Sequence, residues 1–454
     1  MIEQSDVVDW LCEEASALLE EGVGMGSIET LLDRLSLECR RSALERLVQA
    51  ACRRQPSICS HCKRNLKIEE HHRVRQVHSQ FGFIRFERTY GFCSHCDQYI
   101  YPADRILGLQ ERAPASPRIQ EICALTALRA PAGQAQNDVR RLTGIDLDPS
   151  SLHREARRQG ERALALRDAD VALAGTLDGV MELAARAHTP SAPFTLVIEI
   201  DAWNIRERDN WGLTEEFLAQ GKKTERWHWV YTGTVFRLDQ RGTTASGRPV
   251  IAERGYVATR SGIEGFQTQL YAEAIQRGLL EAEEVLILAD GAIWIWNIAD
   301  DRFKDARQRV DLYHVKQHLS SLAKELFGDT QTARDWVGPF LQWLDHRTDG
   351  ALDVIRGLEG LRTTLDQFTD SQQKSIEREI GYFDQHKERM DYKTAKAIGQ
   401  PVGSGAIEST CSQFQRRFKL TGQFWSLSGD EAFLALATLH RNERWSNLFP
   451  HSPP

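Results

Sequence analysis

The sequence predicts a multidomain α/β protein, with helices and a cysteine-bearing hairpin in the first half and a strand-rich half interrupted by helices. Three observations predict this class. The chain has 454 residues, which suggests two to four domains. Two Cys-x-x-Cys pairs flank an alternating, strand-like pattern, and buried-strand patterns from residue 194 onward give way to amphipathic helical patterns over 316–399. With 41% hydrophobic and 27% charged residues, packed cores are expected and wholesale disorder is excluded.

The charge of the chain is unevenly distributed. Its 57 Lys and Arg residues against 64 Asp and Glu residues give a net charge of −7, which argues against a uniformly basic coat for nucleic acid. Residues 1–39, however, carry a net charge of −9, and residues 40–88 carry +8. The acidic mean therefore conceals a basic segment around the first cysteine pair, which is either a solvated face or a binding surface.

No apolar run approaches the roughly 20 residues of a membrane helix, and the acidic start is unlike a secretory signal, so we expect a cytoplasmic protein.

The cysteines point to a metal site rather than to disulfides. Five of the nine cysteines are single, and the other four form two pairs, Cys59-Ser60-His61-Cys62 and Cys93-Ser94-His95-Cys96. Four thiolates satisfy the tetrahedral preference of Zn²⁺, and a closed four-ligand site is structural.

A zinc ribbon over 57–110 accounts for the spacing of the two pairs. They are 30 residues apart, longer than the roughly 15–20 residues of common zinc motifs. The alternating pattern around Gly82 predicts a hairpin between the two knuckles, which supplies the extra length. The alternative is that Cys59, Cys62, Cys93 and Cys96 are buried free thiols.

Helical patterns occupy the rest of the first half. They predict an N-terminal helical region over 1–56 and a second helical segment over 118–168. The last helix of the second segment follows a glycine-containing turn, as in helix-turn-helix proteins. It carries three candidates for DNA contacts: Arg154, Arg157 and Arg158. The alternative is a helical packing unit with a solvated basic face.

The second half carries two aspartates at predicted strand ends. Strand patterns cover 194–201, 226–238, 248–259, 285–290 and 310–314, with a helix over 263–278. Asp201 and Asp290 each end a strand before a small residue, and carboxylates at the carboxyl ends of strands converge at one sheet edge. The element order matches the ribonuclease H-like arrangement, with a first part over 194–315 and a last part over 400–447. The alternative is that both aspartates are ordinary turn residues.

Glu408 is the predicted third carboxylate. It lies in the first turn of a helix predicted over 406–420, and basic residues follow it within three turns, well placed for phosphates. Carboxylate oxygens suit Mg²⁺ or Mn²⁺. Two such ions about 4 Å apart clamp the attacking and leaving oxygens of a phosphodiester. Glu431, in the next predicted helix, is expected to be a solvated position.

These motifs together resemble the DDE transposases of bacterial insertion sequences, most closely the ISKra-type group and more distantly the Mutator-like transposases. The most specific motif is Gly403-Ser404-Gly405-Ala406-Ile407-Glu408, followed by Arg417-Phe418-Lys419 and Gly422-Gln423-Phe424-Trp425. The others are the segments 86–96, 101–109, 197–201, 288–292 and 311–315. The motifs span about residues 57–447, and the acidic N-terminal helices match nothing in the family's pattern.

The resemblance implies roles for individual residues. Asp201, Asp290 and Glu408 are then the metal-binding catalytic triad, and the 117 residues between the last two contain the helical insertion, 316–399. Four residues are implied as catalytic support or DNA contacts: His314, Arg417, Lys419 and Trp425. For His314, a hydrogen-bonded structural role is the alternative.

The sequence therefore predicts a transposase that cleaves DNA at insertion-sequence ends and transfers the strands to target DNA. We expect two Mg²⁺ (or Mn²⁺) ions at the triad and one structural Zn²⁺. The expected partners are double-stranded DNA and further copies of the chain, since synapsis of two ends calls for a homodimer or higher oligomer; no membrane is expected, and the location is cytoplasmic, at the nucleoid. The alternatives are a non-catalytic, transposase-derived DNA-binding regulator, and a ribonuclease H-fold nuclease that only hydrolyses DNA.

Overall fold

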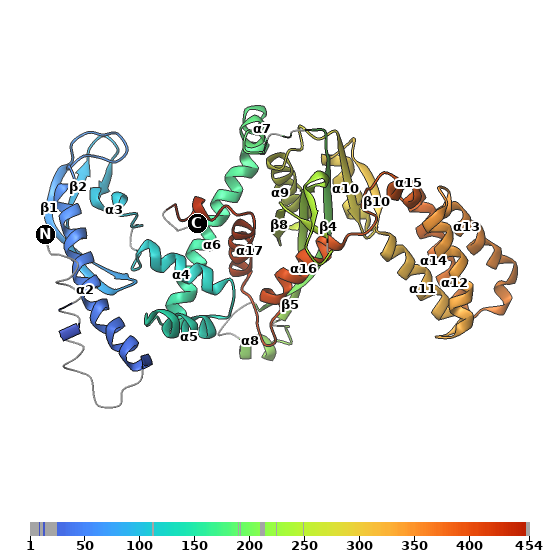
Figure 1. Ribbon diagram of the computed structural model, residues 1–454, viewed down its shortest axis with the longest axis horizontal. Coiled ribbons are helices and arrows are strands. Elements are labelled where there is room, and N and C mark those ends of the chain that lie inside the picture. Colours follow the sequence, from blue (N-terminus) through green and yellow to red (C-terminus); the bar gives the residue numbers. More distant parts are fainter. Residues whose placement is uncertain are drawn as a thin grey trace. The chain divides into compact units, whose positions relative to one another are not determined.

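The computed structural model describes residues 25–110, 113–188, 190, 192–208, 214–223, 225–247 and 249–450, together with residues 9, 12 and 13. The chain divides into two compact units, Met1–Gln159 with Phe449–Pro454, and Gly160–Leu448. Figure 1 labels their helices and strands. No helix of the described residues is long and apolar enough to cross a membrane.

The first unit opens with a helix and a small antiparallel sheet. Its elements are α2 (Met25–Arg54), β1 (Lys67–Ser79), β2 (Gly82–Cys93), β3 (Gln98–Ile100) and α3 (Pro102–Ile106). The sheet order is β1-β2-β3, and Gly82 opens β2 with a φ of 99° that favours glycine. Alternate side chains, including Ile84 and Phe86, are buried and pack with Cys52 and Leu44 of α2. The predicted hairpin is therefore present.

Three helices come next along the chain: α4 (Pro117–Ala127), α5 (Ala132–Thr143) and α6 (Pro149–Ala174), of which α6 continues past the end of the first unit at Gln159. Gly144 ends α5 in the left-handed region. The Asp148 carboxylate accepts the backbone N–H of Ser151 at 3.0 Å, so it satisfies an otherwise unpaired amide at the start of α6.

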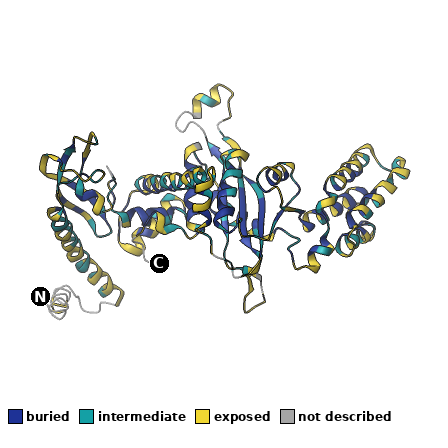
Figure 2. Cartoon of the chain, turned by 90° about the horizontal axis from the view of Figure 1, so that it is seen from above, coloured by how far each residue is buried: buried dark blue, intermediate teal, exposed yellow. Residues whose placement is uncertain are grey.

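The second unit is built on a mixed five-stranded sheet. Its strands are β4 (Thr195–Arg208), β5 (Glu225–Arg237), β8 (Gly255–Thr259), β9 (Glu284–Ala289) and β10 (Arg307–Val310). Their order is β10-β9-β4-β5-β8. β5 pairs antiparallel with β4 and β8, whereas β9 pairs parallel with β4 and β10. Figure 2 shows these strands coloured mainly as buried.

Three predicted strands have different bounds in the structure. The strand predicted over 194–201 continues as β4 to Arg208, because its pairing with β5 extends that far, so Asp201 lies inside the strand and not at its end as predicted. The pattern over 248–259 forms two strands, because β7 (Pro249–Ile251) leaves the main sheet to pair with β6 (Arg241–Thr243). The strand predicted over 310–314 ends at Val310, since the Asp311 carboxylate accepts the N–H of His314 at 2.9 Å and begins a helix there.

Helices cover the sheet. They are α9 (Gly262–Gln276), α10 (Ile293–Arg302), α16 (Gly405–Phe418) and α17 (Leu427–Arg441), with the shorter α7 (Leu177–Ala184) and α8 (Thr214–Ala219) outside them. Phe266 and Leu270 of α9 are fully buried. Gly233 of β5 admits α9 this closely, because a Cβ there would lie 2.7 Å from the Leu270 side chain.

Between β10 and α16, residues 311–404 contain only helices and loops, all of them described. The helices are α11 (Leu312–Phe327), α12 (Gln331–His346), α13 (Gly350–Gly360), α14 (Asp370–His386) and α15 (Tyr392–Ala397). Their apolar faces share a buried core through residues such as Leu319, Leu344 and Phe383. The amphipathic pattern of this segment thus forms a helical bundle inserted after the sheet's last strand.

Candidate functional site

The β4–β9 pairing brings Asp201 and Asp290 together. Ile200 of β4 is paired with Ala289 of β9, and each aspartate directly follows one of these two residues. Neighbouring strands are about 4.8 Å apart, so the two aspartates are neighbours. Burial raises the pKa of Asp201, and the charge of Asp290 raises it further. A cation bound between them would relieve both effects.

Both aspartates also make local backbone hydrogen bonds. The Asp201 Oδ1 atom accepts the N–H of Ala202 at 2.7 Å, and the Asp290 Oδ1 atom accepts the N–H of Ala292 at 3.0 Å. Gly291, with a φ of 105°, allows the chain to turn sharply after Asp290. These bonds fix the orientation of each carboxylate at the end of its strand pairing.

Helix α16 carries Glu408 to the same region. Cys411, one turn further along α16, is buried, and its thiol lies beside the Asp201 carboxyl group. Burial raises the pKa of Cys411, and the charges of Asp201 and Glu408 raise it further, so the thiol stays protonated. Residues three apart share a helix face, and Glu408 is exposed on that face.

The charges of Asp201 and Glu408 both act on Cys411, but the three carboxylates do not form a closed cluster. Among the described residues, the one group of three or more potential ligands with all ligand atoms within 4.8 Å of one another is the four-cysteine group. At least one pair of the oxygens of Asp201, Asp290 and Glu408 is therefore further apart than that. Carboxylate oxygens are the hard donors that Mg²⁺ prefers.

Glu199 attaches α16 to β4. Its side chain is 1% exposed, and its Oε2 atom accepts the N–H of Ile407 at 2.8 Å. Burial raises the pKa of Glu199 to about 8. The first turn of a helix leaves amides without partners, and here a side chain from the sheet, two residues before Asp201, supplies one. The helix that bears Glu408 is thereby fixed to the strand that bears Asp201.

Asp311 connects the starts of two helices. One carboxylate oxygen accepts the N–H of His314 in α11, and the other accepts the N–H and hydroxyl of Ser404, the latter at 2.6 Å, just before α16. The side chain is 1% exposed. Asp311 therefore fixes His314 and the first turn of α16 relative to each other.

Among the predicted supporting residues, His314 is the one whose charge acts on Asp201. Its ring is exposed. A positive charge on the ring would offset a small part of the rise in the pKa of Asp201 that burial causes. One turn further, the ring of His318 stacks on Tyr382 of α14 with centroids 4.2 Å apart. The Tyr382 hydroxyl lies 3.5 Å from the carbonyl oxygen of Asp290. The inserted helices thus contact the Asp290 turn.

The other predicted supporting residues have different environments. Trp425 is 4% exposed, and its indole N–H donates to the carbonyl of Phe418 at 3.0 Å. The Arg417 guanidinium lies 5.1 Å from the Trp425 ring, and burial lowers the pKa of Arg417 to about 10. Of these residues, Lys419 is the exposed one, whereas Trp425 packs the helix end.

Glu431 is not the solvated residue that the sequence predicts. Its carboxylate accepts hydrogen bonds from the Thr259 hydroxyl at 2.5 Å, the Arg260 N–H at 2.8 Å and the Ser261 hydroxyl at 3.0 Å. It also pairs with Arg167. The apolar-face pattern of α17 does not reveal these partners, which come from the turn after β8. With these bonds formed, Glu431 is a structural residue, and Glu408 stays the predicted third carboxylate.

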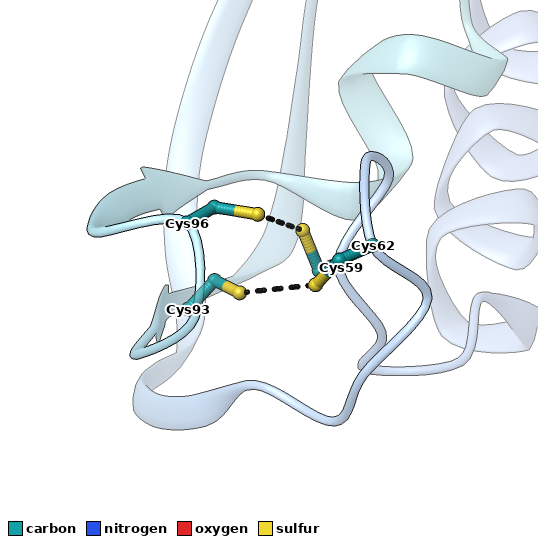
Figure 3. A group of neighbouring side chains, drawn as sticks. All are labelled: Cys59, Cys62, Cys93 and Cys96. Carbon is teal, nitrogen blue, oxygen red and sulfur yellow. Dashed lines mark hydrogen bonds between the residues drawn. The ribbon is translucent and has the colours of Figure 1, made fainter.

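The four paired cysteines converge in the first unit (Figure 3). The Cys59 and Cys96 sulfur atoms are 3.9 Å apart, and those of Cys62 and Cys93 are 3.5 Å apart. Ligands at the Zn–S distance of about 2.3 Å on a tetrahedron lie about 3.8 Å from one another. The cluster therefore fits a tetrahedral zinc ion.

The backbone around the cysteines has the form of two metal-binding knuckles. The residues after the second cysteine of each pair, Lys63 and Asp97, have φ values of 64° and 53°. Hydrogen bonding from the backbone of Cys62, and less strongly from that of His61, lowers the pKa of Cys59 to about 6. The lowered pKa favours the thiolate form of Cys59 that binds metal, whereas hydrogen bonding with Cys62, together with burial, raises the pKa of Cys96.

The three predicted DNA-contacting arginines lie on α6. Arg154 is exposed and donates to the Ser151 hydroxyl at 3.1 Å. Arg158 pairs with the buried Glu155, and Arg157 is half-buried. Arg154 is thus the most accessible of the three.

No protein-family model matches the chain, and no curated protein shows significant similarity to it. Sequence reasoning missed Glu199, Asp311 and Cys411 as parts of this region. An acid inside the otherwise apolar strand 194–200 was the available signal for Glu199.

Proposed function

We propose that the chain is a DDE-type DNA transposase, in which Asp201, Asp290 and Glu408 hold divalent cations for phosphodiester cleavage and strand transfer. The observation that supports this proposal is the strand register, in which Ile200 of β4 pairs with Ala289 of β9, the residues directly before Asp201 and Asp290. The coulombic effect of Asp290 on Asp201 and of Glu408 on Cys411 supports the same grouping.

The sheet supports a ribonuclease H-like core. Three antiparallel strands in chain order, β4, β5 and β8, are followed by two parallel strands on the other side of β4, giving the order β10-β9-β4-β5-β8. Ligands of such sheets bind outside the carboxyl ends of parallel strands. Asp290 lies at such an end, and α16 packs beside β4. The inserted helices α11 to α15 agree with the insertion that the sequence resemblance implies.

The chemistry follows from the donor set. Bound Mg²⁺ ions would activate the attacking oxygen and neutralise charge on the leaving oxygen. The chain's own part is to hold the ligands: Glu199 and Asp311 fix the helix that bears Glu408, and the backbone amides fix Asp201 and Asp290. His314, exposed at the start of α11, is available to contact the DNA.

The first unit supplies DNA binding in this proposal. A zinc ion held by Cys59, Cys62, Cys93 and Cys96 would stabilise a small sheet that cannot bury a large core of its own. The segment 40–88 that forms most of this sheet carries a net charge of +8, which suits the phosphate backbone. Arg154 on α6 adds an exposed cation.

A plasmid assay tests the proposal. Full-length protein and Mg²⁺ are incubated with a supercoiled plasmid that carries the DNA flanking this coding sequence on both sides. We expect cleavage at the element boundaries and joined products, both lost in Asp201→Asn and retained in Asp335→Asn, an exposed aspartate of α12.

Other outcomes select the alternatives. Cleaved but never joined DNA would indicate a nuclease. DNA binding without any Mg²⁺-dependent product would indicate a non-catalytic regulator. Cleavage and joining that persist in Asp201→Asn would refute the triad.

A further inference from the structure

A cavity in the second unit is lined by an unusual number of arginines. Its volume is about 290 Å³, at the lower end of the roughly 300–1,000 Å³ of ligand pockets. The lining arginines are Arg186, Arg237, Arg254, Arg277, Arg441 and Arg444. Two carboxylates, Glu253 and Glu443, also line it, so the wall has an excess of four positive charges.

Four of these arginines have carboxylate partners outside the cavity wall. Arg277 and Arg444 share Glu273 at 2.9 and 2.7 Å. Arg237 pairs with Asp239 at 2.7 Å, and Arg186 with Asp170 at 2.7 Å and Glu182 at 3.0 Å. These pairs hold the wall in place and neutralise part of its charge.

Arg254 and Arg441 differ from the other four. In the described part of the chain, neither has a carboxylate oxygen within 4.0 Å of its guanidinium. Arg441 donates to the neutral side chain of Gln413 at 2.5 Å and lies 4.8 Å from the Phe414 ring. Burial lowers the pKa of Arg441. A half-buried cation without an anionic partner gains from an anion that enters the cavity.

The carboxylates of the wall do not neutralise this pair. Glu253 lies 3.2 Å from the His188 ring nitrogen, and Glu443 is exposed beyond the end of α17. Burial raises the pKa of the nearby Glu199, and the charge of Arg254 offsets part of that rise. That carboxyl group is bonded to the α16 backbone and lies outside the cavity lining.

We propose that this cavity binds a phosphate group, with Arg254 and Arg441 as its principal ligands. Guanidinium groups present paired N–H donors that match the oxygens of phosphate. The same chemistry comes from a DNA strand or from a free phosphate compound. We favour a DNA strand, and that choice rests on the proposed function.

The position of the cavity supports the choice of DNA. The lining residue Arg237 is paired with Leu196 of β4, five residues before Asp201. At about 3.3 Å per residue along a strand, the two are separated by about 16 Å. This is about half a helical turn of duplex DNA. A duplex that spans both positions would place a phosphate at the cavity.

Binding measurements on the full-length chain test the proposal. A fluorescein-labelled duplex of about four helical turns is titrated by anisotropy at several salt concentrations, and sodium pyrophosphate is titrated by calorimetry. We expect Arg254→Gln to weaken duplex binding by about tenfold and to reduce the salt slope by about 1. Arg441→Lys keeps the charge and the packing stem but loses the paired donors, so a smaller loss with the same fold is expected. Arg356→Gln, an exposed arginine of α13, should change neither.

The outcomes separate the two sources of phosphate. If Arg254→Gln weakens both probes and pyrophosphate displaces the duplex, the DNA form is supported. If it weakens pyrophosphate binding alone, the phosphate site stands and the ligand is a free phosphate compound. If neither probe responds to Arg254→Gln or Arg441→Lys, the proposal is overturned. Asp201→Asn should retain this binding, so loss of cleavage and loss of the phosphate site are distinguishable.

Discussion

Asp430 and Glu207 form a buried acid pair whose ionisation should make the stability of the second unit depend on pH. Both side chains are 0% exposed. The Arg260 Nε atom lies 2.6 Å from Glu207 and 3.2 Å from Asp430, and the His228 ring lies 3.2 Å from Glu207. One arginine balances one carboxylate, so the second carboxyl group is stable in the protonated form.

The direction and size of the effect follow from the pKa of Asp430. Burial raises it, and the neighbouring Glu207 raises it further, to about 9, against about 3.9 in an unfolded chain. Between these values the folded protein binds more protons than the unfolded chain, so stability falls as pH rises, by up to about 1.4 kcal/mol per pH unit. The contribution of Asp430 is complete below about pH 4 and is lost as pH rises through about 9.

Asp430→Asn should remove this dependence, because an amide of the same shape cannot ionise and can still donate to Glu207. From about pH 6 to about pH 8, we expect the unfolding free energy of the wild type to fall by about 2 kcal/mol relative to that of Asp430→Asn. Urea unfolding, followed by tryptophan fluorescence, measures it. Asp335→Asn, an exposed aspartate, is the matched control. Parallel pH profiles for wild type and Asp430→Asn would refute the reasoning.

Three further predictions concern other parts of the chain. Cys93→Ser should lower the zinc content, measured by elemental analysis, below one ion per chain, and it should lower the thermal midpoint of the first unit. An unchanged zinc content would contradict the four-cysteine site. Trp425→Ala should cost about 3–5 kcal/mol of stability in urea unfolding, because a buried indole is lost; a cost near zero with loss of DNA binding would instead assign Trp425 to the DNA. Tyr382→Ala should raise the Mg²⁺ concentration for half-maximal cleavage by about tenfold, because the side chain of Tyr382 supports the Asp290 turn. Tyr382→Phe keeps the ring against Gly291, so it should raise this concentration less. Equal effects of the two Tyr382 variants would refute a packing role for the ring.

Local patterns predicted the elements of this fold well. Alternation around Gly82 predicted the hairpin, apolar runs predicted β9 and the first half of β4, and the amphipathic repeat predicted the helices after residue 316. These signals are short-range, because each depends on neighbouring residues. The error at 310–314 has a local cause: an apolar pattern continues through Asp311, whereas the helix that begins there depends on the hydrogen bond of its carboxylate with His314.

The contacts that position the candidate site could not be predicted in the same way. Glu199 bonds to Ile407 and Asp311 to Ser404, across 208 and 93 positions of the chain. No periodicity reports such a partner. Cys411 is buried, and its place beside Asp201 follows from the packing of α16 on β4.

The rate of Mg²⁺-dependent DNA cleavage by three single variants, Asp201→Asn, Asp290→Asn and Glu408→Gln, measures the central claim most directly. Metal-assisted stabilisation is worth several kcal/mol, so each variant should lose more than about a hundredfold in rate while it still binds DNA with the wild-type salt dependence. Asp335→Asn should cleave at the wild-type rate. Wild-type cleavage in any one of the three variants would contradict a site made of these carboxylates.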